Sequence, residues 1–244
     1  MTNTTYIAPR SLSPAQAATA RQRACSDQAT RVTRSLAGYG ILAGPCYVVL
    51  SLSQAVTREG FDLSRHAWSQ LALGDWGWLQ VANLVGTGVM ASAFAVALRR
   101  TLRGGRGGRA VPALVATFGV GLLLAGIFTT DPMGGFPVGM STPATPSVHG
   151  ILHLATSGIG FVALAAAMVV MARRYASEQR RGRAVFSVVA AVALLGGFAT
   201  IASGSPLGVI ALTVGILTAF AWMTGLGIDT FSRATYALAG PARG

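Results

Sequence analysis

The chain has 244 residues, of which 52% are hydrophobic and only 11% are charged. Soluble domains carry about 25% charged residues, so this composition excludes an ordinary water-soluble domain and indicates a protein that folds in lipid. The formal net charge is +12, but the basic residues lie between apolar runs and not along one soluble face, so no nucleic-acid partner is expected. All 19 basic residues are arginines, which excludes a lysine nucleophile.

Six apolar runs follow a polar segment, residues 1–33, which we expect to be a disordered cytoplasmic tail. Each run is close to the roughly 20 residues that cross a bilayer core, and in lipid such runs have to be helical. The sequence therefore predicts an all-α polytopic membrane helix bundle over residues 34–229 and a second cytoplasmic tail over residues 230–244. The predicted spans are Leu36–Val56, Trp78–Leu98, Ala110–Thr130, Val148–Met171, Ala184–Ser203 and Pro206–Ile228.

The arginines are distributed unevenly among the connections. Only Arg58 and Arg65 fall outside the N-terminal segment, the connections after the second and fourth spans, and the C-terminal segment. Basic residues collect on the cytoplasmic side of multi-span proteins. The sequence therefore predicts a multi-pass protein of the cell (inner or plasma) membrane with both termini in the cytoplasm.

The connection between the first two spans, Phe61–Gly74, has helical spacing of its own. Leu63, Ala67 and Leu71 share one side of such a helix, and Gly74 suits its end. We expect a short extracytoplasmic amphipathic helix that lies on the membrane surface over the bundle. Three tryptophans lie where an outer aromatic belt would be: Trp68, Trp76 and Trp78.

The stretch from Thr129 to His153 holds the densest group of reactive side chains. Asp131 ends the third predicted span, and His149 and His153 lie four residues apart at the start of the fourth, so that their imidazoles share a helix face. Ser157 continues this face one turn deeper. Ionisable groups at such depth usually face the bundle interior or a water-filled cavity. We therefore treat Asp131, His149, His153 and Ser157 as candidate catalytic residues.

Two histidines at this spacing can bind one zinc ion with a carboxylate as a further ligand, and zinc activates a bound water as a nucleophile. The candidate metal ligands are His149, His153, Asp131 and His66. The segment lacks the glutamate of the H-E-x-x-H motif. The alternative is that hydrogen bonds to Asp131, to backbone carbonyls or to Ser157 give these histidines a purely structural role.

Three further residues are candidates for ligand binding. His66 and Asp75 flank the predicted surface helix, and simple solvation is the alternative for both. Asn83 lies inside the second predicted span, where an amide needs a hydrogen-bond partner. The alternative for Asn83 is an interhelical hydrogen bond.

Several short motifs resemble the domain-of-unknown-function 998 family of prokaryotic membrane proteins. They are Gly44-Pro45, the segment Arg65–Gly74 followed by Gly77-Trp78 and Asn83, and Asp131-Pro132 followed by His149 and His153. The resemblance covers about residues 36–228. It implies a six-span integral membrane protein without an established activity, and it suggests that His66, Asp131, His149 and His153 be considered together.

Two functions fit these expectations. The first is the binding of a lipid or small apolar ligand, or the support of other membrane proteins, with membrane lipids as the immediate partners. The alternative is a metal-dependent hydrolase that acts on a lipid-like substrate at the outer leaflet, with zinc as the cofactor. A haem carrier would need histidines on two facing helices, and only the fourth predicted span contains any. Whether the protein is an enzyme stays open at this point.

Overall fold

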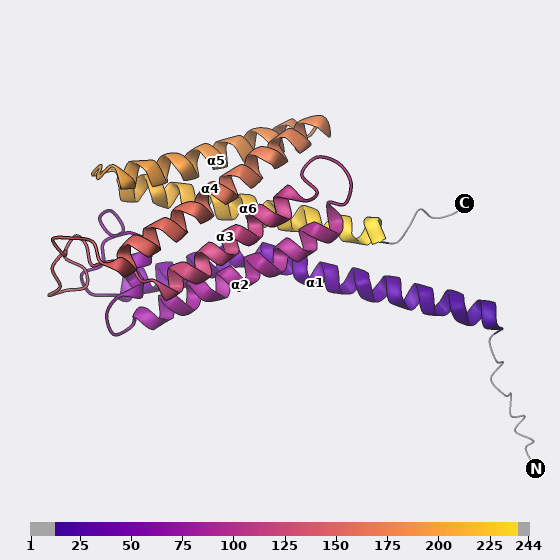
Figure 1. The fold of residues 1–244 in the computed structure, drawn as a ribbon, viewed down its shortest axis with the longest axis horizontal. Helices are drawn as coiled ribbons and strands as arrows, with labels where there is room; N and C mark the ends of the chain where they lie inside the picture. Colours follow the sequence, from indigo (N-terminus) through magenta and orange to yellow (C-terminus); the bar gives the residue numbers. More distant parts are fainter. Residues whose placement is uncertain (1–12, 239–244) are drawn as a thin grey trace, which may run out of the picture.

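The computed structural model describes residues 13–238, and within them it contains six α-helices and one short 3-10 helix (Figure 1). All six α-helices are long and apolar enough to cross a membrane. The predicted all-α, six-span membrane bundle is therefore confirmed. The helices are α1 (Pro14–Thr57), η1 (Trp68–Ala72), α2 (Gly77–Thr101), α3 (Ala110–Ile127), α4 (Val148–Ser177), α5 (Arg181–Ala202) and α6 (Gly208–Leu238).

The six α-helices form a closed ring. Each helix packs against its neighbours in the chain, and α6 packs against α1 to close the ring. Because α2 also touches α6, the interior of the ring is divided into two parts. The start of α1 and the end of α6 lie toward the same end of the bundle, as an even number of spans requires (Figure 1).

The segment over residues 1–33, expected to be disordered, is helical from Pro14 onward, and residues 1–12 lie outside the described residues. A capping box explains this start: the Ser13 side chain accepts a hydrogen bond from the Gln16 backbone, and the Gln16 side chain accepts one from the Ser13 backbone. Pro14 occupies the first turn, which tolerates proline. The first part of α1 projects beyond the other helices (Figure 1).

The C-terminal end of the bundle is also more helical than predicted. The helix α6 continues past the predicted end of the sixth span at Ile228 and runs to Leu238. Part of the predicted tail over residues 230–244 is thus helical, and residues 239–244 lie outside the described residues.

The predicted amphipathic helix over Phe61–Gly74 is replaced by turns and by the short 3-10 helix η1. The Asp62 carboxylate accepts hydrogen bonds from the backbone and hydroxyl of Ser64, which favours a turn over a helix. Trp68 is only 3% exposed. The segment therefore packs against one end of the bundle.

Close backbone approaches hold the helix pairs together. A Cβ atom at Gly88 of α2 would lie 2.6 Å from the Gly119 carbonyl oxygen of α3. A Cβ atom at Gly227 of α6 would lie 2.8 Å from the Gly40 carbonyl carbon of α1. Small residues at such contacts are typical of membrane helices, where van der Waals packing drives association.

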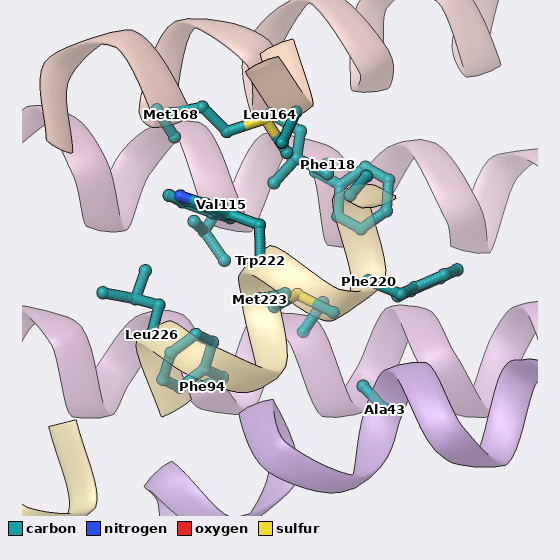
Figure 2. Packing of buried hydrophobic residues seen from close by; sticks show 14 of the residues in the cluster. Ala43, Phe94, Val115, Phe118, Leu164, Met168, Phe220, Trp222, Met223 and Leu226 are labelled. Carbon is teal, nitrogen blue, oxygen red and sulfur yellow. The ribbon is translucent and has the colours of Figure 1, made fainter. Parts of the chain in front are cut away.

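The buried apolar core fills the middle of the ring (Figure 2). Phe94 from α2 and Met223 and Leu226 from α6 belong to this core, at the place where these two helices meet. Phe118 from α3 and Leu164 from α4 lie in the same cluster. The part of the ring between α1, α2 and α6 is therefore solidly packed.

Candidate functional site

A cavity of about 820 Å³ lies between α3, α4, α5 and α6. Residues of η1 and of the α3–α4 connection line one end of the cavity. We call this end of the bundle the loop end, and the opposite end the arginine end. Phe118, Leu164 and Phe220 are the cavity-lining residues farthest from the loop end along α3, α4 and α6. All three belong to the buried core (Figure 2). The walls above them are largely apolar, with Leu122 and Ile216 as examples.

One wall of the cavity is open. Ile151 and Leu154 of α4 line the cavity, although they are 54% and 52% exposed. Deeper in the bundle the contact between α4 and α5 is closed, since the rings of Phe161 and Phe198 meet edge-on with centroids 5.5 Å apart. The cavity is thus accessible beside the first turns of α4.

His153 lies in the cavity wall and is 7% exposed. Its Nδ1 lies 2.8 Å from the carbonyl oxygen of Phe128 and 3.1 Å from that of Ala125. Both carbonyls belong to the C-terminal end of α3, where the last carbonyls of a helix lack intrahelical partners. His153 therefore caps α3 with one ring nitrogen and fixes the spacing of α3 and α4.

His66 has a different environment. Its Nδ1 accepts a hydrogen bond of 2.9 Å from the backbone of Asp62, and its Nε2 donates one of 3.1 Å to the carbonyl of Gly134. The ring packs between Phe61 and Phe136, with both centroid distances 5.5 Å. Because both nitrogens are used, His66 joins the two connections of the loop end and has no free lone pair for a metal.

Asp131 lines the cavity and anchors the start of α4. One of its carboxylate oxygens accepts a hydrogen bond of 2.9 Å from the backbone of Ser147, the N-cap of α4. A carboxylate is stabilised at this position by the helix dipole. A Cβ atom at Gly150 would collide with the same carboxylate. His149 is exposed, and its ring contacts that of Phe128 edge-on at 5.7 Å.

The four predicted zinc ligands do not form one site. Among the described residues, no three histidine, cysteine, aspartate or glutamate side chains are placed to hold a metal ion together. Of the candidate catalytic residues, Asp131, His153 and Ser157 line the cavity, whereas His149 does not. The structure thus brings together three of the predicted side chains in the wall of an apolar cavity.

Asn83 takes part in a polar cluster between α1 and α2. Its amide nitrogen lies 3.1 Å from both the Tyr47 carbonyl oxygen and the Ser51 hydroxyl. The Gln80 side-chain oxygen accepts a hydrogen bond of 2.9 Å from the Gln54 amide. Asn83 does not line the cavity, so the geometry favours the structural alternative. Gln54 and Gln80 were not predicted as members of this cluster, although polar residues inside apolar runs signal such a role.

Arg58 holds the loop end together. Its guanidinium donates hydrogen bonds to the carbonyls of Leu71 at 3.1 Å and Leu73 at 2.6 Å, and it lies 5.2 Å from the centre of the Phe136 ring. Burial lowers the pKa of Arg58, and the nearby charge of Asp75 partly offsets this effect. Asp75 is exposed and does not line the cavity. This role of Arg58 was not predicted from the sequence.

The arginine end carries a cluster of ion pairs. Asp229, whose side chain is only 11% exposed, pairs with Arg180 at 2.8 Å, with Arg183 at 2.7 Å and with Arg233 at 3.1 Å. Glu178 pairs with Arg233 at 2.7 Å. The hydrogen bond from Arg233 lowers the pKa of Glu178. This cluster joins α6 to the α4–α5 connection.

Comparison with known proteins yields one match. A family model described as "Protein of unknown function (DUF998)" matches residues 41–229. No curated protein and no solved structure matches the chain. The match covers most of the bundle, and the resemblance noted from the sequence motifs is confirmed.

Proposed function

The chain belongs to the DUF998 family, and from that premise we propose that it is a membrane protein that binds a lipid or another small apolar ligand in the cavity between α3, α4, α5 and α6. The observation that supports this proposal is the cavity itself. Protein interiors are close-packed, and voids larger than a water molecule are few. A cavity of about 820 Å³ with apolar walls falls within the size range of ligand sites.

The cavity can be tested through the fluorescence of Trp68, which lines it and is 3% exposed. The Trp76→Phe and Trp78→Phe changes remove two tryptophans that are 59% and 60% exposed. Trp222 remains, but it is buried and does not line the cavity, so it adds a constant fluorescence and the change on titration reports on Trp68. In this background, purified protein in phosphatidylcholine nanodiscs is titrated with bromododecane, whose bromine quenches tryptophan on contact. We expect saturable quenching, because an apolar chain that fills the cavity comes close to Trp68.

A matched pair of variants separates the cavity from the surrounding lipid. Ser157→Phe places a large side chain in the cavity and should weaken quenching about tenfold or more, since it removes the space for the chain. Ile159→Phe, two residues away on the same helix at a site that is 62% exposed, should leave quenching unchanged. Equal quenching in the two variants would contradict the proposal.

The hydrolase alternative rests on Asp131, His153 and Ser157, which line the same cavity. It receives less support, because His66 and His149 are not available as further zinc ligands at that place. The zinc content of the purified protein, compared between wild type and His153→Ala, tests the alternative directly. One zinc per chain that disappears in the variant would favour the hydrolase over simple ligand binding.

We also assign the arginine end to the cytoplasm, by the preference of arginine for that side. Cys25 is exposed in the basic part of α1. A membrane-impermeant maleimide should therefore label Cys25 only in permeabilised cells. A Ser141→Cys variant in a Cys25→Ser background places the thiol in the α3–α4 connection and should be labelled in intact cells. The reverse pattern would invert the topology.

A further inference from the structure

His153 has one ring nitrogen in use and one with no hydrogen-bond partner among the described residues. Nδ1 faces the carbonyl oxygens of Phe128 and Ala125, which can only accept hydrogen bonds. Nδ1 therefore carries the hydrogen, and the neutral ring presents a lone pair at Nε2. Because His153 is 7% exposed and part of the cavity wall, this acceptor faces a largely apolar space.

Two of the larger polar side chains that line the cavity are already paired within the protein. The indole nitrogen of Trp68 donates to the hydroxyl of Thr213 at 3.1 Å, and the amide of Gln70 donates to the carbonyl of Met133 at 3.0 Å. Ser157 lies one turn beyond His153 on α4 and also lines the cavity, and none of the hydrogen bonds in residues 13–238 involves its hydroxyl. A hydrogen-bond acceptor and a hydroxyl thus stand one above the other in an apolar wall.

A ligand that supplies a donor to an acceptor in an apolar wall gains affinity and orientation. A hydroxyl group fits this pair of residues, because it can donate to His153 and accept from Ser157 at the same time. The mouth carries Arg65 and Asp131, which have opposite charges. It therefore favours neither an anionic nor a cationic head group.

We propose that the cavity takes a neutral single-chain lipid whose head group carries a hydroxyl, and that His153 accepts the hydrogen bond from this hydroxyl. This inference rests on the proposed function and names the class of ligand. The tail would run toward Phe118 and Leu164. At 1.5 Å per residue, His153 and Leu164 are roughly 16 Å apart along α4, which suits an extended alkyl chain of medium length. The opening beside Ile151 and Leu154 gives such a lipid a way in.

Three probes of equal chain length test the role of the hydroxyl: bromododecanol, its methyl ether and bromododecane. Quenching of Trp68 is measured in the full chain carrying Trp76→Phe and Trp78→Phe, in phosphatidylcholine nanodiscs, with each probe expressed as its mole fraction in the lipid. The ether accepts hydrogen bonds but donates none. We expect the alcohol to bind about three- to tenfold more tightly than the ether, the range that hydrogen bonds in membranes contribute.

Two variants assign the preference to His153. His153→Phe keeps a ring of similar size without an acceptor, so the alcohol and the ether should bind equally. This change also removes the hydrogen bonds to the end of α3, so retained binding of bromododecane is the control for an intact cavity. His153→Gln retains an amide donor for α3 and an amide oxygen for the ligand, and should restore part of the preference for the alcohol.

Each outcome separates this inference from the proposed function. Equal binding of the three probes by the protein with native His153 overturns the hydroxyl assignment and leaves the apolar cavity site standing. A preference for the alcohol that survives in His153→Phe places the acceptor elsewhere and overturns the role of His153. Absence of quenching by any probe overturns both the ligand class and the proposed function.

Discussion

Between α1 and α2, the ring is closed by polar side chains that bind one another, whereas between α3 and α6 it stays open around an apolar cavity. In the first region, Asn83 and Gln80 bond to groups of the neighbouring helix. In the second region, one ring nitrogen of His153 bonds to the end of α3 and the other faces the cavity. The first region also holds an unused group, because the Gln54 side-chain oxygen is buried without a partner. Access to a cavity, and not the number of unused groups, thus distinguishes a candidate ligand contact from a packing residue.

The largest effect is expected from overfilling the contact between α2 and α3. Gly88→Leu would force a side chain into a space where even a Cβ atom lies 2.6 Å from the Gly119 oxygen. We expect a loss of about 3 kcal/mol or failure to fold, at the upper end of overpacking effects. Gly86 has no neighbouring atom within 4 Å of its Cβ position. Gly86→Leu is therefore the control and should unfold in detergent titrations like wild type.

The next largest effect comes from replacing a polar residue by leucine in each of the two regions and comparing the free energies of unfolding. Asn83→Leu leaves the Ser51 and Gln80 side chains short of a partner and should lower the free energy of unfolding by about 1–2 kcal/mol. Ser157→Leu, in the cavity, should change it by less than about 0.5 kcal/mol, because no protein group loses a hydrogen bond. Similar losses in both variants, measured by unfolding in a denaturing detergent, would remove the distinction between the regions.

The smallest effect is expected from an ion-paired side chain that lies outside the membrane-spanning segments. Glu178→Gln should cost less than about 1 kcal/mol, since the carboxylate is partly exposed. The pKa of Glu178 is lowered in the folded protein, so its contribution is complete above the ordinary glutamate pKa of about 4.3 and is lost as the pH falls below it. The difference between wild type and variant should therefore shrink in thermal unfolding at acidic pH. Glu59→Gln, at an exposed site, is the control and should unfold like wild type at neutral pH.

Much of the fold follows from the sequence, because lipid leaves a long apolar run no alternative to a helix. The starts of α3 at Ala110 and α4 at Val148 were predicted to the residue. The extension of α1 to Pro14 was not, because a polar helix beyond the membrane depends on caps and local propensity, which an apolar pattern does not record. The prediction of a helix over Phe61–Gly74 was wrong for a related reason: hydrogen bonds to the Asp62 side chain stabilise a turn in place of the helix that the apolar spacing predicted.

The site could be predicted only in part. Spacing along one helix predicted a shared face for His149, His153 and Ser157, whereas in the structure His153 and Ser157 line the cavity and His149 is exposed. It could not show that Nδ1 of His153 is used by α3, or that His66 bonds to Gly134, because these partners lie far away in the chain. The cavity itself leaves no pattern in the sequence, since its walls are made of the same apolar residues as a packed core.

The closed ring also sets an order of assembly. The last helix of the chain, α6, packs against the first, α1, where Gly227 meets Gly40 and the Thr224 hydroxyl bonds to the Ile41 carbonyl. During synthesis the spans emerge in order, so α1 has to wait for α6 before this contact can form. Until then the cavity lacks one wall. The cavity that we assign to a ligand therefore forms only after the last helix has been inserted, and a partly inserted chain does not contain it.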